Sequence, residues 1–287
     1  MKKLIRLGQY LFLSAWAIFC IFPLFWMVST SFKPQLEWIT TPIHWLPRDP
    51  TFVNYQVIFA PGSVSAQNAM LTTTTGSALK AIKDSLILTS TSTILALLIG
   101  TATAYAISRF KTGGRNLPFA ILQVRMLPPV AALVPLLIMF STIHQYDAYW
   151  PLVLLYTGFT MPFAVWLMKS FIDEVPRALE EAAIVDGCSN VTAIWRVTIP
   201  LVAGGLAATG LFVFIIVWSD FIVALTLTQE RVVTLPVQLS KYVSGTSGQL
   251  YGPQAALGTI AVIPVVIFGL LIQRYLVRCL TFGAIKR

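Results

Sequence analysis

Two ionisable residues of this chain lie inside long hydrophobic stretches, where a charge needs a functional or structural reason. Arg125 lies within the stretch 118–141, and Asp220 lies within the stretch 200–227. If these stretches cross a membrane, each charge costs roughly 3 kcal/mol on insertion scales, so its head normally faces a water-filled cavity or a partner. Both residues are therefore candidates for a path that a polar solute follows, with a structural or interfacial role as the alternative.

Residue patterns for catalysis, nucleotide binding or metal binding are absent from the sequence. It has no G-x-x-x-x-G-K-[ST] loop that could hold nucleotide phosphates and no H-E-x-x-H motif. The two histidines, His44 and His144, lie in predicted loops and lack the spacing of metal ligands. We expect no catalytic residue, no metal ligand and no cofactor bound by this chain.

The elements that would position Arg125 and Asp220 are mostly hydrophobic runs. The 287 residues are 56 % hydrophobic and 11 % charged, with a mean hydropathy of +0.77, which leaves too few polar residues to cover a soluble surface of this size. Apolar runs of about 18 residues or more are typical of transmembrane helices. We predict an all-α polytopic membrane protein that forms one domain over residues 1–287. Its six spans are placed at about 10–30, 85–107, 118–141, 149–169, 200–227 and 257–275.

Two of these spans carry signals for packing and kinking. Gly100 and Ala104 give the second span a face of small residues, which lets helices approach closely in lipid. Pro128, Pro129 and Pro135 mark a kink or break in the third span, because proline removes a backbone hydrogen bond. Such a break serves either a solute path or helix packing.

Lys and Arg residues concentrate in the segments that this arrangement places on one side of the membrane. They lie at both termini, after the second span and in the loop 171–199, whereas the longer loops on the other side contain fewer. Cytoplasmic loops carry such an excess, so both termini and the loop 171–199 are predicted to face the cytoplasm. The net charge of +9 follows from the same rule and does not indicate a nucleic-acid partner.

The loop 171–199 is a long polar interruption with helical signals of its own. Pro176 suits the first turn of a helix, and the run RALEEAAIVD after it contains good helix formers. Gly187 stands where a left-handed C-cap is expected. Ser189 or Asn190 can cap a second short helix that stops at Pro200. The pattern predicts helix, tight glycine turn, helix; an ordinary helical hairpin between two spans is the alternative.

This loop resembles the coupling loop of the membrane permeases of ATP-binding-cassette importers. Glu181-Ala182-Ala183, three residues, Gly187, nine residues and Val197-x-Ile199-Pro200 match the pattern E-A-A-x3-G-x9-I-x-L-P, with aliphatic replacements at Val197 and Ile199. In that family the loop forms a coupling helix that docks into a groove on a separate ATPase. The resemblance implies ATPase-coupling roles for Glu180, Glu181, Ala182, Ala183, Asp186, Gly187 and Pro200.

Three further segments resemble the carbohydrate-type branch of these permeases. Phe52-x-Asn54-Tyr55 is similar to an F-x-N-Y segment, and Trp218-Ser219-Asp220-Phe221 is similar to a W-N-[ED]-F patch. The segment from Arg278 to Lys286 resembles the R-G-L-T-x-G-A-V-K-G ending, with Cys279 where glycine is common.

The last outer loop resembles the loop that reaches toward the solute-binding protein in maltose-type importers. It contains Thr234-Leu235-Pro236-Val237, followed by glycine and tyrosine residues. The resemblance implies binding-protein contacts for Tyr242, Gly245, Gly248 and Tyr251. The alternative is an interfacial loop in which the glycines only permit tight turns.

The chain is thus identified as a member of the carbohydrate-type permease family, the class of the maltose and glycerol-phosphate importers, and as the shorter of two permease partners. The resemblance implies the type I importer fold and half of a translocation pathway for a sugar, oligosaccharide, polyol or sugar phosphate. It implies a bacterial cytoplasmic (inner) membrane location, with membrane lipid around the spans. The implied protein partners are a second, different permease, two copies of an ATPase that binds ATP and Mg²⁺, and an extracytoplasmic solute-binding protein. ATP hydrolysis is expected on the ATPase, so this chain is expected not to be an enzyme.

Other functions remain as alternatives. A permease of the same fold for a non-carbohydrate solute differs only in cargo, which no residue identifies. An ion-coupled secondary transporter would be expected to show internal repeats and paired intramembrane acids, which we do not find in the sequence. A membrane-embedded enzyme would need clustered catalytic residues, which we also do not find.

Overall fold

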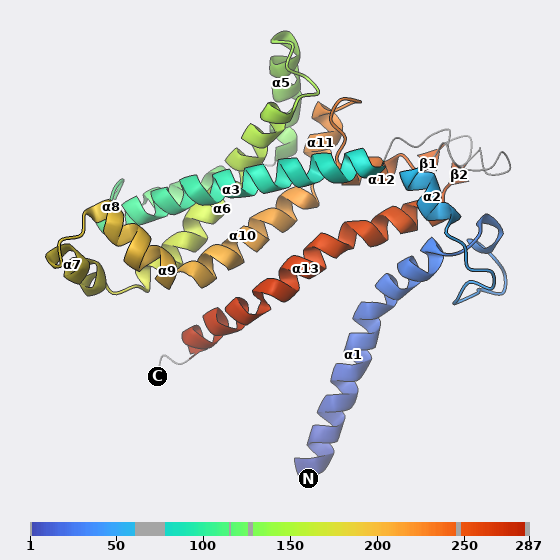
Figure 1. Cartoon of the computed structure of the whole chain (residues 1–287), viewed down its shortest axis with the longest axis horizontal. Coiled ribbons are helices and arrows are strands. Elements are labelled where there is room, and N and C mark those ends of the chain that lie inside the picture. The colour runs from blue at the N-terminus through green and yellow to red at the C-terminus, as the bar shows by residue number, and fades with distance from the viewer. Residues whose placement is uncertain (1, 61–77, 115, 126–128, 245–247, 285–287) are drawn as a thin grey trace. The chain divides into compact units, whose positions relative to one another are not determined.

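The chain is mostly helical in a computed structural model that describes residues 2–60, 78–114, 116–125, 129–244 and 248–284 (Figure 1). Side chains are described within residues 6–243 and 248–273. The helices, in chain order, are α1 Lys2–Ser31, η1 Gln35–Glu37, α2 Val53–Phe59, α3 Ala78–Phe110, α4 Leu117–Val124, α5 Pro129–Thr142, α6 Tyr149–Asp173, α7 Arg177–Val185, α8 Asn190–Ala193, η4 Ile194–Thr198, α9 Ile199–Leu201, α10 Ala203–Trp218, α11 Ile222–Leu227, α12 Leu235–Ser240 and α13 Tyr251–Ala284. The strands are β1 Val243–Ser244 and β2 Gly248–Gln249, which pair antiparallel with Val243 opposite Gln249.

Four helices in the described part of the chain are long and apolar enough to cross a membrane. They cover Arg6–Ser31, Ala78–Phe110, Tyr149–Asp173 and Tyr251–Gln273, and the bent pair Asn190–Leu201 and Ala203–Trp218 would supply a fifth span. The remaining predicted span, 118–141, contains the two shorter helices α4 and α5, and Pro128, one of the prolines predicted to mark a break, lies outside the described residues. The all-α membrane fold is thus confirmed, and the predicted count of six spans is compatible with these helices.

The chain divides into two compact units, each with its own packing. One comprises Met1–Ile82 and Val237–Pro264, and the other comprises Lys83–Pro236 and Val265–Arg287. Both candidate regions of the sequence, the polar loop and the residues Arg125 and Asp220, belong to the second unit.

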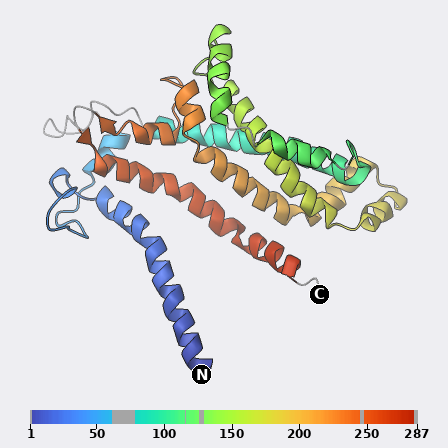
Figure 2. The same cartoon turned by 180° about the vertical axis from the view of Figure 1, so that it is seen from behind.

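The core of the second unit forms where α3, α6 and α10 run beside one another, which both views show (Figures 1 and 2). Apolar side chains from these helices, from α5 and α11, and from the loop after α11 make one buried cluster: Leu88, Ala96, Leu133, Phe140, Leu152, Tyr156, Ala164, Val213, Val217, Val223, Leu227 and Val232. Gly100 faces Ala164 so closely that a Cβ at Gly100 would lie 2.7 Å from the Ala164 Cβ. The predicted close packing of the small-residue face is therefore confirmed.

In the first unit, the F-x-N-Y segment fixes the end of α1. Asn54, on α2, donates from Nδ2 to the carbonyl oxygens of Ser31 and Lys33, at 2.9 Å each. The rings of Phe52 and Tyr55 pack against Phe32, with centroids 5.5 and 5.3 Å away. These contacts tie the segment after α1 to the end of that helix.

Candidate functional site

The helix α7 in the polar loop has ends that local sequence explains. Pro176 is its N-cap, with φ −60° and ψ 130°, so the helix begins one residue after the proline rather than at it. At the other end, the Cys188 N–H donates to the Ala183 carbonyl and the Gly187 N–H to the Ile184 carbonyl, both at 3.0 Å. These two bonds form a Schellman motif. Gly187 has φ +92°, so the predicted left-handed glycine cap is confirmed.

The second helix of the loop begins as predicted but continues beyond Pro200, its predicted end. Ser189 is the N-cap of α8, and its Oγ accepts a hydrogen bond from the Thr192 N–H at 3.2 Å. The prediction that the helix stops at Pro200 is wrong, because α8, the π-helical turn η4 and α9 continue to Leu201, and the 75° bend follows at Val202. Pro200 lies in the first turn of α9, and the π turn before it already departs from the α-helical bonding that proline would break.

Glu180 connects the polar loop to the end of α3. The Arg109 guanidinium donates from Nε to both carboxylate oxygens, at 2.9 and 3.1 Å, and from Nη2 to Oε1 at 2.8 Å. The Tyr105 hydroxyl donates to Oε2 at 2.9 Å, and the Thr198 hydroxyl donates to Oε1 at 2.8 Å. One carboxylate on α7 therefore binds two residues of α3 and one residue of η4.

The contacts around Glu180 keep it ionised. Burial alone would raise the pKa of its carboxyl group, but the hydrogen bonds from Arg109, Thr198 and Tyr105 outweigh burial and lower the pKa below its ordinary value. A second link lies beside it, where the Arg177 Nη2 donates to the Ser108 carbonyl at 2.7 Å. The first turn of α7 is thus fixed to α3 at two points.

The rest of α7 and the turn after it are turned outward. Of the residues for which the sequence implied coupling, Glu180 is buried, Ala183 is half-buried, and Glu181, Ala182, Asp186, Gly187 and Pro200 are exposed. Large apolar side chains accompany them: Leu179, Ile184, Val185, Val191 and Trp195 are exposed, Val185 by 86 %. An exposed apolar surface of this kind on a polar loop is typical of a docking site for another protein.

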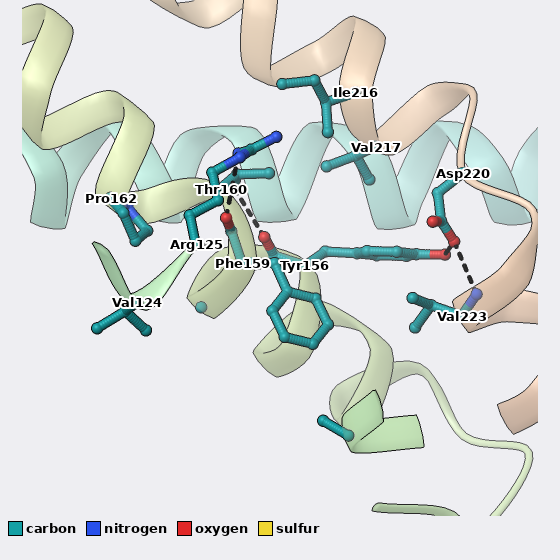
Figure 3. A pocket seen from close by; sticks show the side chains of 12 residues that line it. Val124, Arg125, Tyr156, Phe159, Thr160, Pro162, Ile216, Val217, Asp220 and Val223 are labelled. Carbon is teal, nitrogen blue, oxygen red and sulfur yellow. Dashed lines mark hydrogen bonds between the residues drawn. The ribbon is translucent and has the colours of Figure 1, made fainter. Parts of the chain in front are cut away.

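Arg125 and Asp220, far apart in the sequence, line the same cavity of about 290 Å³ in the second unit (Figure 3). The other lining residues come from α4, α5, α6, α10 and α11: Val124, Ala132, Tyr156, Gly158, Phe159, Thr160, Pro162, Ile216, Val217 and Val223. The wall is mostly apolar, with a few polar groups directed inward, as in solute-binding sites.

Each charged residue of the cavity is held by its surroundings. The Arg125 Nη1 donates to the Phe159 carbonyl at 3.2 Å, and its guanidinium lies 4.3 Å from the centre of the Phe163 ring. The Asp220 Oδ2 accepts from the Tyr156 hydroxyl at 3.0 Å and from the Val223 N–H at 3.2 Å (Figure 3). The cavity therefore contains a guanidinium group and a carboxyl group, each hydrogen-bonded to its surroundings.

Two further acidic residues, which no sequence pattern above singles out, hold the segment 229–233 of the second unit. Asp147, before α6, accepts from the backbone N–H groups of residues 229–232 at 2.7–3.0 Å. Asp84, on α3, accepts from the Tyr149 hydroxyl at 2.7 Å and from the Val233 N–H at 3.0 Å. The chain has only 11 acidic residues, so a carboxylate at the end of a span was a signal that could have found both.

The outer-loop residues predicted to contact a binding protein lie in different surroundings. Tyr242 is fully buried, and burial raises the pKa of its hydroxyl to about 12. Gly248 is exposed in the β hairpin with φ +71°, and Tyr251 is half-buried at the start of α13. Gly245 lies outside the described residues. Within the described residues, no group of three or more His, Cys, Asp or Glu side chains could hold a metal ion.

Comparison with known proteins shows what this arrangement is similar to. Residues 96–281 match the family described as binding-protein-dependent transport system inner membrane component. The chain is 35 % identical over 276 residues to the probable ABC transporter permease protein y4oR of Sinorhizobium fredii, which covers 96 % of this chain and 94 % of the relative. It is 31 % identical over 273 residues to the trehalose/maltose transport system permease protein MalG of Thermococcus litoralis, over 94 % of this chain and 93 % of the relative.

A solved structure supports the fold. The crystal structure of a bacterial ABC transporter involved in the import of the acidic polysaccharide alginate contains a chain that superimposes with a TM-score of 0.74 at 21 % identity, over 95 % of this chain and 96 % of that one. At this level of identity the likeness concerns the fold.

Proposed function

Since the chain belongs to the family of binding-protein-dependent transport system inner membrane components, we propose that it is the permease subunit of an ATP-driven importer of carbohydrates. A relative with 31 % identity is named a trehalose/maltose permease, which supports this cargo class. The cargo would be a sugar, oligosaccharide, polyol or sugar phosphate, and this chain would form half of its path.

The proposed assembly contains this chain, a second and different permease, two ATPase subunits and an extracytoplasmic solute-binding protein. The chain would lie in the bacterial cytoplasmic membrane with both termini in the cytoplasm, as its Lys and Arg distribution favours. ATP and Mg²⁺ would bind to the ATPase subunits, in line with the missing phosphate-binding loop of this sequence.

The single observation that carries the coupling role is the Glu180 contact. It joins α7 to Arg109 on α3 and to Thr198 on η4, so a displacement of α7 moves both together. The exposed apolar residues of the loop, with Glu181, Asp186 and Gly187 among them, would form the surface that an ATPase grips. Nucleotide-driven movement of the ATPase would thereby bias the spans between two arrangements.

Arg125 and Asp220 would face the solute path. Their cavity combines an apolar wall with a donor and an acceptor, which suits a solute that carries hydroxyl groups. On the outer side, Gly248 and Tyr251 remain candidates for contact with the binding protein, because both are at least partly accessible.

Gentle purification of the tagged chain from its host, followed by mass identification of the proteins that accompany it, tests the proposal. We expect an ATPase, a second permease and an exported binding protein, and the ligand of that binding protein would identify the cargo. The purified assembly in proteoliposomes should take up that ligand only with ATP inside the vesicles. Recovery of the chain alone, with uptake driven by an ion gradient, would overturn the proposal in favour of a secondary transporter.

A further inference from the structure

A second cavity of the second unit, of about 600 Å³, lies where α3 and α6 end and α4 begins. It is lined by Ile107, Ser108, Lys111, Gly114, Pro118, Phe119, Trp166, Lys169 and Ser170. It shares no lining residue with the cavity of Arg125 and Asp220. The positive-inside rule places these helix ends at the cytoplasmic face of the membrane, at the depth of the lipid head groups.

The lining of this cavity is amphipathic. Phe119 and Trp166 present large apolar side chains that are 62 % and 47 % exposed. On membrane-spanning helices such side chains suit lipid chains, and tryptophan favours the level where the head groups begin. Lys111, Lys169 and Ser170 supply the polar part. The cavity therefore has one side suited to hydrocarbon and one side suited to a polar head group.

The polar side carries positive charge that its surroundings only partly balance. Lys169 pairs with Asp173, whose other carboxylate oxygen accepts from the Ser108 hydroxyl. Lys111 is exposed just after the last residue of α3, and in the part of the chain that the structure describes its ammonium group has no hydrogen bond or ion pair. The ammonium group of Lys111 is therefore available to bind a ligand.

We propose that this cavity binds an anionic phospholipid, with the phosphate at Lys111 and Lys169 and the acyl chains along Phe119 and Trp166. Charge complementarity selects the anionic head group, because basic pockets between membrane helices on the cytoplasmic side attract such lipids. The apolar wall favours a lipid over free phosphate, which has no apolar part to bury. The head group would border Ser108, whose carbonyl accepts the hydrogen bond from Arg177 of α7.

Quenching of tryptophan fluorescence by brominated lipids tests the assignment. The purified assembly is reconstituted in phosphatidylcholine bilayers that contain equal mole fractions of either brominated phosphatidylglycerol or brominated phosphatidylcholine, with the bromine atoms near the head groups. We expect stronger quenching by the anionic lipid. Because the chain has eight tryptophans, the Trp166→Phe variant shows which part of the signal comes from the cavity; it should lose the excess quenching.

Charge variants separate a specific site from general attraction to the surface. Lys111→Gln should reduce the excess quenching several-fold, while Arg6→Gln, which removes a positive charge from the same side of the membrane outside the cavity, should leave it unchanged. Equal effects of the two variants, or equal quenching by both lipids in the unmodified chain, would overturn the proposal. Loss of the excess on addition of inorganic phosphate to phosphatidylcholine-rich bilayers would assign the site to free phosphate instead. All readouts concern lipid binding and hold whatever solute the assembly imports.

Discussion

Arg109 and Glu180 form a buried, two-pronged ion pair although 71 residues separate them in the chain. Their side chains are only 7 % and 9 % exposed, and the hydroxyl groups of Tyr105 and Thr198 occupy further positions on the carboxylate. Burial of this charge pair is offset by the hydrogen bonds that both carboxylate oxygens and the Nε and Nη2 groups of the guanidinium make. The polar loop is therefore attached to α3 through side chains and not only through the backbone.

Glu180→Ala should destabilise the chain and uncouple it from its ATPase. Removing one partner of a buried ion pair leaves an unpaired charge, here Arg109, at a cost of about 3–5 kcal/mol. The thermal unfolding temperature of the purified assembly and ATP-dependent uptake in proteoliposomes measure the two effects. Glu181→Gln is the matched control, because this exposed neighbour should keep the unfolding temperature unchanged. An unfolding temperature for Glu180→Ala equal to that of the control would contradict the structural role.

Asp147→Asn should loosen the loop at residues 228–233. The carboxylate accepts four backbone N–H groups, whereas an amide presents one acceptor and adds a donor that faces them, at a cost of about 2 kcal/mol. Hydrogen exchange of these backbone amides measures the effect. Asp49→Asn, a change of the same type in an exposed loop, should leave their exchange unaltered.

Asp147 also determines how the stability of the chain changes with pH. Burial alone would raise the pKa of Asp147, but the hydrogen bonds from residues 229–232 outweigh it and lower the pKa. A carboxyl group with a lowered folded-state pKa contributes stability that is complete above its unfolded pKa, about 3.9, and is lost as pH falls through the lower value. The difference in stability between the unmodified chain and Asp147→Asn should be full at neutral pH and shrink below about pH 4. A difference that grows on acidification would refute the assignment.

Gly187→Ala should weaken ATPase docking moderately, and Gly187→Asp should weaken it strongly. The backbone has φ +92°, and nothing lies within 4 Å of an added Cβ, so the cost of alanine is that of the backbone alone, about 1 kcal/mol. Aspartate adds a charge to the surface that the partner would contact. Co-purification of the ATPase measures docking, and Gly269→Ala, at a helical glycine with equally open space, should leave it unchanged. Normal docking and uptake in Gly187→Asp would count against the coupling role.

Features that depend on neighbouring residues were predictable from the sequence. The hydrophobic runs located the helices, and the glycine after RALEEAAIVD located the end of α7, because spans and caps are set within a few residues. The end of the second helix was not predictable from Pro200, since a π-helical turn before the proline lets the helix continue. The rule that proline ends a helix fails at Pro200 because the π-helical turn before it already departs from the α-helical hydrogen bonding that proline would break.

Contacts between distant residues could not be read from the sequence. Arg109 is one of the basic residues that follow the second predicted span, and nothing local in the sequence connects it with Glu180. Likewise Tyr156, 64 residues before Asp220, gave no signal as its hydrogen-bond partner. Hydrophobicity indicates that a helix is buried, but only the packing of the helices decides which polar groups meet.

Asp220→Asn should raise the KM for uptake while the assembly remains intact. The amide keeps the volume and can still accept from Tyr156, but it removes the negative charge from a cavity that also contains Arg125. If the carboxylate contacts a solute hydroxyl group, the loss should be about tenfold in KM, which corresponds to about 1.4 kcal/mol. Radiolabelled uptake with a titrated solute concentration gives KM and the maximal rate separately.

A purely structural role of Asp220 predicts a different outcome. The carboxylate also accepts from the N–H groups of Val223 and Ala224, at 3.2 and 3.4 Å, and so supports the first turn of α11. Asp220→Ala loses this support at a cost of about 1 kcal/mol and should lower the unfolding temperature, whereas Asp220→Asn should lower it less. Ser219→Ala, at an exposed neighbour outside the cavity, should change neither KM nor stability. If Asp220→Asn leaves KM unchanged while Asp220→Ala lowers the unfolding temperature, Asp220 only holds α11 in place and does not contact the solute.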